Sequence, residues 1–154
     1  MKKQSAGILL FRLIDLKIQV FLVHPGGPFW KHKDEGAWTI PKGEFTDEEK
    51  ALDAAIREFK EETGIKISGK FMKLSPVKQK SGKIVHAWAI EGELDTLTLK
   101  CETLVNLEWP PKSGKLQSFP EIDKGDWFSA NEAKQKINSS QVMLIDELIE
   151  KLSA

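Results

Sequence analysis

The chain has 154 residues, of which 40% are hydrophobic and 30% are charged, and its 23 basic residues balance its 23 acidic ones. This length and composition are ordinary for one soluble globular domain, residues 1–154, and no apolar run approaches the roughly 18 residues of a membrane span. Cys101 is the only cysteine, which excludes an intrachain disulfide and a cysteine metal site, so we expect a reduced, cytoplasmic protein with no membrane partner.

Up to residue 64 the sequence pattern predicts a strand hairpin, a long loop and one helix. In chain order, the expected segments are strands at 5–11 and 18–23, a loop at 24–37, a short extended piece at 38–41 and a helix at 46–63. A loop of this length inside a compact domain is more often functional than a simple connection. Thr46 and Glu49 form a capping-box pattern at the start of the helix, and Gly64 follows its end.

Beyond residue 64 the pattern predicts two strands, an irregular region and a closing helix. The expected segments are strands at 71–79 and 83–94, an uninterpreted stretch at 100–120, a strand end at 126–128 and a helix from Ser129 to about Leu152. A core stripe along that helix is expected from Ile137, Leu144, Leu148 and Leu152. Because strands and helices alternate without a strict strand–helix–strand rhythm, we predict an α/β protein with a mixed sheet covered by helices.

Charge is distributed unevenly along the chain although the total is zero. Residues 43–65 carry eight acids and three bases, whereas residues 66–90 carry six lysines and no acid. An ordinary solvated surface would explain this pattern. A site in which an acidic patch holds metal and nearby lysines hold phosphate would explain it too.

The acidic segment 46–63 is amphipathic when it is placed on a helical wheel. One face carries four apolar residues that must pack on the sheet, namely Leu52, Ala55, Ile56 and Phe59. Glu58, Glu61 and Glu62 converge on the opposite face, where like charges destabilise a helix by a few tenths of a kcal/mol per pair. Mg²⁺ would reverse this repulsion because clustered carboxylates are its usual protein ligands. An exposed acidic helix with ordinary Glu–Lys pairs remains the alternative at this point.

The spacing of the acidic segment resembles the box motif of the Nudix hydrolase family. The matching positions are Gly43, five residues, Glu49, seven residues, Arg57-Glu58, apolar Phe59, one residue, Glu61-Glu62, one residue, Gly64 and apolar Ile65. A motif with nine fixed positions in 23 residues is specific, and the loop–helix–turn context agrees with it. The resemblance implies the α/β/α sandwich of that family, with a mixed β-sheet between helices.

The resemblance also implies a set of site residues and a reaction. Members hydrolyse a nucleoside diphosphate linked to another group, using Mg²⁺ or Mn²⁺ bound by the box glutamates. Carried over, the metal ligands are Glu58, Glu61, Glu62 and the backbone carbonyl of Lys42. Glu58 is also a candidate for taking the proton of the attacking water, Arg57 would orient the glutamates with Glu49 as its partner, and Gly43, Glu49 and Gly64 are structural positions of the box.

Many members of the family add a further acid from a later loop, a few residues before a tryptophan. Glu121, six residues before Trp127, is the candidate here, while Glu102, Glu108 and Asp123 are its rivals. Hydrolysis of a phosphoanhydride by water needs metal ions to neutralise the phosphate oxygens and a carboxylate to take one proton. No covalent nucleophile is needed, and the sequence offers no obvious one.

Substrate contacts are expected from the basic segment and from the tryptophans. Lys42, Lys80 and Trp38 are our candidates, with Lys78 and Lys83 as further lysines that could hold phosphate. The alternative for each lysine is a solvent-facing side chain, and the alternative for each tryptophan is core packing.

The substrate is predicted from the residues that lead into the box. The stretch WTIPKGE (38–44) resembles the corresponding segment of dinucleoside polyphosphate and diphosphoinositol polyphosphate hydrolases. We therefore expect a small nucleotide substrate, namely a dinucleoside polyphosphate or a nucleoside triphosphate. An RNA 5′-end pyrophosphohydrolase and a non-catalytic nucleotide-binding module are the alternatives. The zero net charge argues mildly against a nucleic-acid partner, and the oligomeric state is left open by the sequence.

Overall fold

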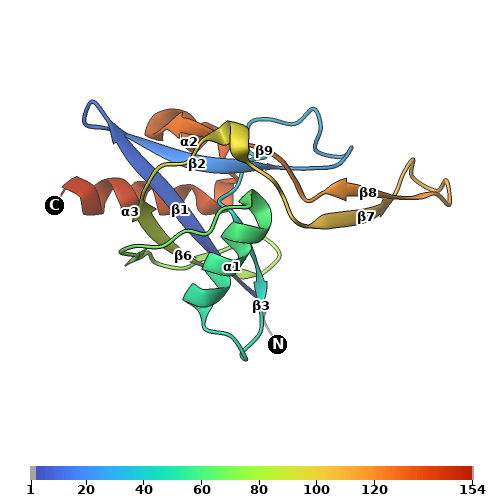
Figure 1. Ribbon diagram of the computed structural model, residues 1–154, viewed down its shortest axis with the longest axis horizontal. Coiled ribbons are helices and arrows are strands. Elements are labelled where there is room, and N and C mark those ends of the chain that lie inside the picture. The colour runs from blue at the N-terminus through green and yellow to red at the C-terminus, as the bar shows by residue number, and fades with distance from the viewer. Residues whose placement is uncertain (1–2, 154) are drawn as a thin grey trace.

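A mixed β-sheet forms the centre of the molecule in the computed structural model, which describes residues 3–153 (Figure 1). Its seven strands are β1 (Gln4–Ile14), β2 (Lys17–Pro25), β3 (Lys42–Phe45), β4 (Met72–Lys73), β5 (Val77–Lys78), β6 (Ile84–Glu91) and β9 (Ile122–Ser129). The main path runs β4-β6-β1-β2-β9, while β3 pairs with β1 and β5 pairs with β6. Only β1 and β6 are parallel among these pairs, so the predicted mixed sheet is confirmed.

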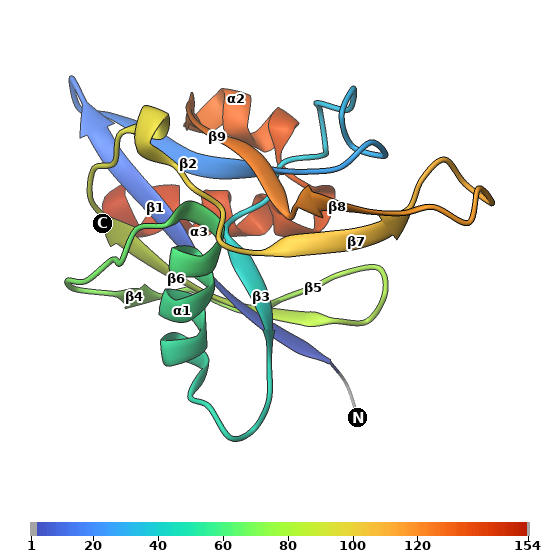
Figure 2. The same ribbon diagram turned by 45° about the vertical axis from the view of Figure 1, so that its right-hand side comes forward.

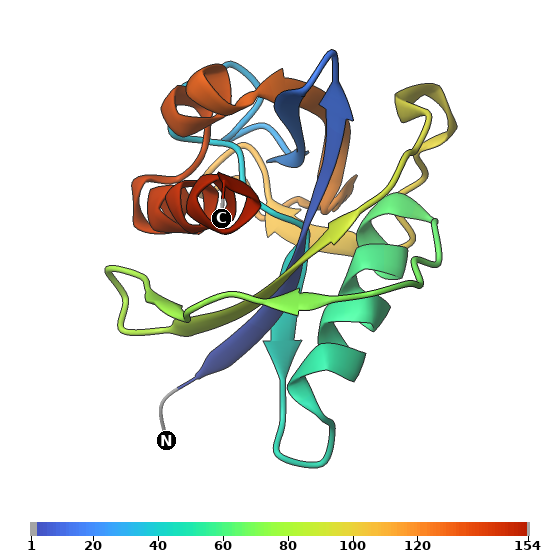
Figure 3. The same ribbon diagram turned by 90° about the vertical axis from the view of Figure 1, so that its left-hand side faces the viewer.

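Helices cover both faces of the sheet, as Figure 3 shows. Helix α1 (Ala51–Thr63) lies on one face, and α2 (Ala130–Lys136) and α3 (Val142–Ser153) lie on the other. Strand β1 feeds both layers because successive side chains point to opposite faces of a strand. Ile8 and Leu10 pack on the α1 side, whereas Leu9 and Phe11 pack on the α3 side. The predicted α/β/α arrangement is confirmed, and no helix within residues 3–153 is long and apolar enough to span a bilayer.

Helix α1 begins later than the sequence predicted. Its first residue is Ala51, and the preceding Lys50 is extended with no side-chain capping bond. The expected capping box from Thr46 and Glu49 is therefore wrong, because the Glu49 carboxylate binds Arg57 instead. The predicted end is confirmed: Gly64 adopts a left-handed conformation, with φ 79°, and its N–H donates to Lys60 O at 2.7 Å.

The region 100–120, for which no element was predicted, contains a β-hairpin. Strands β7 (Leu104–Glu108) and β8 (Leu116–Pro120) form a separate two-stranded sheet that projects from the body (Figures 1 and 2). Pro110 and Gly114 lie in its turn and so do not interrupt either strand. The hairpin was missed because its strands carry little apolar patterning: no residue of either strand is fully buried, and partial burial is limited to Val105, Leu107 and Phe119.

The closing helix is interrupted, which corrects the prediction of one helix from Ser129 to Leu152. The predicted cap is confirmed, since Ser129 Oγ accepts a hydrogen bond from Glu132 N at 3.2 Å. Helix α2 stops at Lys136, and the chain then passes through the short 3-10 helix η2 (Ser139–Gln141) before α3 starts. Leu152 is 37% exposed and does not belong to the core.

The interruption between α2 and α3 positions the segment that leads to β3. Gln141 is fully buried, and its Oε1 accepts the N–H of Ile40 at 3.0 Å. The Gln141 amide also bonds Thr39 Oγ1 at 2.9 Å. Thr39 in turn pairs with Val23 of β2. Residues 38–41 are therefore held to both β2 and η2, and this fixes where β3 begins.

Candidate functional site

Helix α1 lies against β1 and β3 with its glutamates turned toward β3. Ala54, Ala55 and Phe59 are fully buried beneath it, and Glu62 is only 5% exposed. The helical wheel had placed Glu62 on the face opposite the one that packs on the sheet, and this expectation is corrected because Glu62 is buried as well. Strand β3 covers this side of the helix, so Glu62 is enclosed between the two elements.

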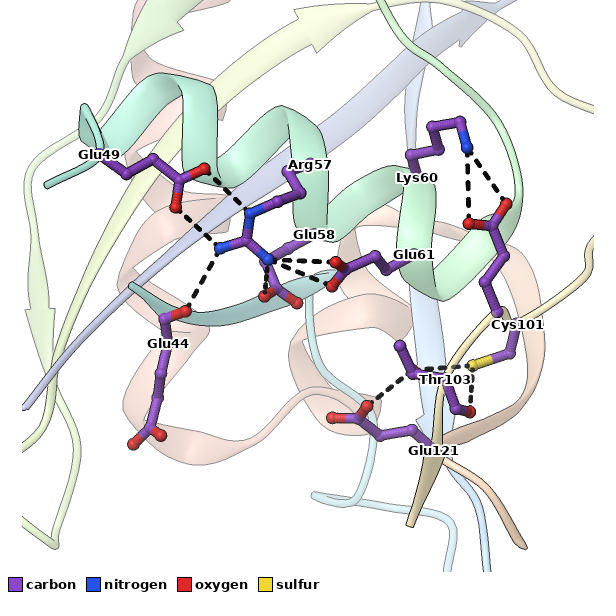
Figure 4. Close-up of polar contacts among 10 residues, drawn as sticks. Glu44, Glu49, Arg57, Glu58, Lys60, Glu61, Cys101, Thr103 and Glu121 are labelled. Carbon is purple, nitrogen blue, oxygen red and sulfur yellow. Dashed lines mark hydrogen bonds and ion pairs between the residues drawn. The ribbon is translucent and has the colours of Figure 1, made fainter. Parts of the chain in front are cut away.

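Arg57 connects the carboxylates at the centre of α1 (Figure 4). Its Nε and Nη2 donate to the two oxygens of Glu49, both at 2.9 Å. Its Nη1 donates to Glu58 at 2.7 Å and to Glu61 at 3.2 Å. This bidentate geometry fixes the guanidinium plane, and the Arg57 hydrogen bond holds the pKa of Glu49 below its ordinary value. The structure thus brings together Arg57 and Glu49 in the arrangement that the sequence predicted.

Gly43 makes room for the Glu58 carboxylate. A Cβ atom at position 43 would lie 2.0 Å from both Cδ and Oε2 of Glu58. No real Cβ tolerates such a contact, so any other residue would displace this carboxylate. Gly43 is required here by close approach, since its backbone does not adopt a positive φ.

Replacing Gly43 with alanine is expected to lower turnover by about 10–100-fold, which is the usual effect of disturbing the support of a site residue. The added methyl group must push Glu58 away from β3, while the rest of the helix can stay in place. Steady-state kinetics together with the melting temperature test this. Gly92→Ala serves as the control for alanine substitution, because Gly92 does not adopt a positive φ and a Cβ there would meet only the end of the Leu10 side chain, at 3.2 Å. Unchanged kinetics in Gly43→Ala would contradict the assigned contact.

Burial makes two of the box glutamates hold their protons more tightly. It raises the pKa of Glu62 well above its ordinary value, and the negative charges of Glu121 and Glu58 add to this effect. Burial also raises the pKa of Glu58, although its bond to Arg57 opposes the shift. A nearby cation would relieve both carboxylates.

Glu121 joins the same site from the other end of the chain. A cavity of about 340 Å³ is lined by Ser5, Lys42, Gly43, Glu44, Glu58, Glu61, Lys83 and Glu121. The Glu121 carboxylate accepts a hydrogen bond from Thr103 Oγ1 at 2.7 Å, which holds it at the start of β9 (Figure 4). Its rivals have other partners: Glu102 pairs with Lys60, Asp123 pairs with His24, and Glu108 accepts the N–H of Lys112.

Lys42 contributes both its backbone and its side chain. Its N–H donates to Glu62 Oε1 at 3.3 Å. The N–H and C=O of one residue in an extended strand point to the same side, so the Lys42 carbonyl faces the carboxylates as well. Its side chain lines the cavity, where burial lowers the pKa of Lys42 and the charge of Glu62 opposes that shift.

Two predicted substrate contacts lie away from this cavity. Trp38 is only 5% exposed, its indole N–H donates to Asp34, and its ring packs against His24 and Phe128. A buried ring leaves no face for a base, so Trp38 is a core residue. Lys80 borders a different cavity, between the β5–β6 turn and η2.

Ser5 and Glu44 were not singled out by the sequence. They reach the cavity because they pair in register between β1 and β3. Ser5 and Glu44 could have been predicted as cavity residues only if the pairing of β1 with β3 had been known. Strand pairing across 39 residues is a long-range property that local patterns do not contain.

The donor atoms of the cavity fit an oxygen-preferring divalent cation. Four carboxylates line it, a fifth (Glu62) lies beside it, the Lys42 carbonyl faces it, and Gly43 leaves space for Glu58. Mg²⁺ and Mn²⁺ are bound by such oxygen ligands together with waters and substrate phosphates. Within residues 3–153 no three acidic, histidine or cysteine side chains already converge as a metal cage, and Arg57 binds the oxygens of Glu58 and Glu61 in this arrangement.

Comparison with known proteins identifies a family and a set of similar folds. The sequence matches the NUDIX domain family over residues 1–148. The structure is similar to the NUDIX domain of Shewanella oneidensis NrtR complexed with ADP ribose, with a TM-score of 0.68 and 17% identity over 99% of this chain and 89% of that one. It is also similar to the Caenorhabditis elegans Ap4A hydrolase, with a TM-score of 0.63 and 21% identity over 98% of both chains.

A MutT/nudix family protein from Listeria innocua is a third similar structure, with a TM-score of 0.63 and 14% identity over 98% of this chain and 94% of that one. At these identities the structural matches establish the fold. A comparison with curated protein sequences finds no significant match.

Proposed function

The chain belongs to the NUDIX family of pyrophosphohydrolases, and from this premise we propose that it hydrolyses a phosphoanhydride bond with Mg²⁺ or Mn²⁺. The substrate is a nucleoside diphosphate linked to another group, and water attacks phosphorus. One observation carries the proposal: Glu58, whose pKa is raised by burial, shares a cavity with Glu121 and the Lys42 side chain, and the buried Glu62 lies beside it at the Lys42 N–H. Such a site suits a divalent cation together with a polyanion.

The glutamates and the arginine of α1, together with Lys42 and Glu121, each have a proposed role. Glu58, Glu61, Glu62 and the Lys42 carbonyl would hold the metal, which supplies charge neutralisation and a bound water of lowered pKa. Glu58 accepts the proton of the attacking water. Arg57 keeps Glu58 and Glu61 in position, because its bidentate hydrogen bonds to Glu49 fix the plane of the guanidinium group. Glu121 adds a fourth carboxylate, and the Lys42 ammonium holds a phosphate oxygen.

A dinucleoside polyphosphate or a nucleoside triphosphate is the proposed substrate. The resemblance of residues 38–44 to dinucleoside polyphosphate hydrolases supports it, and one similar structure is an Ap4A hydrolase. Another similar structure was solved with ADP ribose, so a substrate with only two phosphates must be included in any test. We also propose a cytoplasmic location, since Cys101 is a free thiol.

A substrate panel tests the proposal directly. The purified protein is incubated with Mg²⁺ or Mn²⁺ and with dinucleoside polyphosphates, canonical and oxidised nucleoside triphosphates, ADP-ribose, NADH and triphosphorylated RNA, and the products are separated. We expect turnover of the polyphosphates that stops when EDTA is added. Reaction in H₂¹⁸O would place the label on the attacked phosphate. Turnover of none of these compounds would overturn the enzymatic proposal.

A further inference from the structure

The cavity has two chemically different ends because β3 is an edge strand. Within the described part of the chain, β3 pairs with β1 alone. Successive side chains of a strand point to opposite faces. Position 43 faces Glu58 and α1, so Lys42 and Glu44 project to the opposite face of β3. Strand β3 lies between β1 and α1 (Figure 2). The cavity is lined from both faces of this edge: Glu58 and Glu61 come from the α1 side, and Lys42, Glu44 and Lys83 come from the opposite side.

Cationic groups gather on that far side. Ser5 pairs in register with Glu44 across β1 and β3, and with Val85 across β1 and β6. Lys83, two residues before Val85, therefore projects to the same face. Its Nζ lies 3.1 Å from Oε1 of Glu44. Lys42 and Lys83 thus place two ammonium groups on the face opposite the box glutamates.

Two polar groups at this end lack a partner inside the protein. Ser5 is fully buried, and its Oγ is the one buried side-chain oxygen or nitrogen within residues 3–153 that makes no hydrogen bond. Lys42 takes part in none of the ion pairs formed within the same residues. Buried hydroxyl groups are nearly always hydrogen-bonded in folded proteins. An unpartnered hydroxyl in the lining of a cavity that also holds two ammonium groups is a donor available to an anion.

We propose that Ser5, Lys42 and Lys83 form a second phosphate subsite, which binds the part of the phosphate chain that extends beyond the hydrolysed pyrophosphate unit. This inference rests on the proposed function, because it assumes that the pyrophosphate unit lies at the carboxylate end. It restricts the contribution of this subsite to nucleotides with at least three consecutive phosphates. A substrate with two phosphates, such as ADP-ribose, would leave the second subsite empty.

Glu44 competes with the substrate in this subsite. Its carboxylate binds Lys83 and is half exposed, so an arriving phosphate can displace it. Glu44→Gln should therefore release Lys83 and strengthen phosphate binding, whereas Lys83→Met should weaken it. Ser5→Ala removes the unpartnered hydroxyl and should leave the melting temperature unchanged or higher, which separates its effect on binding from any effect on folding.

Calorimetric binding of tripolyphosphate in EDTA tests the subsite without any turnover. We expect Ser5→Ala and Lys83→Met each to weaken binding by about 10-fold, because each variant loses one charge-assisted hydrogen bond to the phosphate chain. Glu44→Gln should strengthen binding. Lys78→Met is the matched control, because Lys78 belongs to the same basic segment but does not line the cavity. Wild-type affinity in both Ser5→Ala and Lys83→Met would overturn the subsite.

Kinetics with Mg²⁺ test the substrate restriction. In Ser5→Ala and Lys83→Met, kcat/KM should fall by about 10-fold for a nucleoside triphosphate or dinucleoside tetraphosphate and stay within twofold for ADP-ribose. Equal losses for both substrate classes would overturn the restriction. The two proposals can fail separately. If tripolyphosphate binding depends on Ser5 but no nucleotide is turned over, only the enzymatic proposal is refuted. If nucleotides are turned over but binding is unchanged in Ser5→Ala and Lys83→Met, only the subsite is refuted.

Discussion

Replacing Glu58 with glutamine is expected to lower kcat by about 10²–10⁴-fold, the range for removing a general base. Its carboxylate lies against Gly43 at the edge of the cavity and accepts a hydrogen bond from Arg57. Glutamine has the same shape and keeps an oxygen for Arg57, so the network around Glu49 can persist. What is lost is the charge that a metal ion needs and the basic oxygen that takes a proton from water.

The measurement is steady-state kinetics on the best substrate of the panel, accompanied by a melting curve. Asp53→Asn is the matched control, because Asp53 is an exposed acid on the same helix, away from the cavity. We expect that variant to retain wild-type kcat. If Glu58→Gln kept kcat within about threefold of the wild type, Glu58 would be neither the base nor an essential ligand, and Glu61 would become the next candidate.

Replacing Glu62 with glutamine is expected to change stability and activity in opposite directions. Glu62 is 5% exposed, and its one hydrogen bond is the long one from the Lys42 N–H. An ionised carboxylate in such a place destabilises the metal-free fold. The variant should therefore melt at least roughly 2 °C higher than the wild type in EDTA at pH 8. Turnover should fall by more than about 100-fold, beyond the usual effect of losing an outer-shell partner.

The pH dependence of this difference follows from the direction of the Glu62 pKa shift. Burial, together with the charges of Glu121 and Glu58, raises the pKa of Glu62 above its ordinary value of 4.5. The folded state therefore binds this proton more tightly than the unfolded chain does. The stabilising effect of this bound proton is complete below pH 4.5 and is lost as the pH rises through the raised pKa. The free energy of unfolding of Glu62→Gln should therefore exceed that of the wild type by an amount that grows from pH 4.5 up to the raised pKa and stays constant above it.

Metal should reverse the order of stability. Saturating Mg²⁺ stabilises a protein that binds it only when folded, so the wild type should gain in melting temperature and Glu62→Gln should gain less. Glu61→Gln is the control in EDTA: its side chain is 32% exposed and pairs with Arg57, so neutralising it relieves little buried charge. A Glu62→Gln variant that is less stable than the wild type in EDTA at pH 8 would contradict the account of this buried carboxylate.

The family and the mixed α/β fold were predicted from the sequence because the motif is local. Gly43, Glu49, Arg57 and Gly64 lie within one strand, the turn that follows it and one helix with its end, so the spacing of these residues is readable from a short stretch of the chain. Arg57 forms bidentate hydrogen bonds to Glu49 in the structure, as expected. Gly64 ends the helix in a left-handed conformation, also as expected. The error at the start of α1 came from a capping pattern whose Glu49 carboxylate binds Arg57 instead. The error in the closing helix came from the break at η2, where Gln141 bonds Thr39 and Ile40.

Tertiary structure decided what local spacing could not. Glu121 reaches the carboxylates through the strand order that places β9 beside β2, and Thr103 then orients it. Burial of Glu62, and hence its raised pKa, depends on β3 lying alongside α1. Ser5 enters the cavity only through pairing with Glu44. The sequence by itself thus determined the acidic helix and the family motif that it carries, because both are contained within 23 residues. Strand pairing and packing determined which groups face that helix, because these contacts join residues that are distant in the chain.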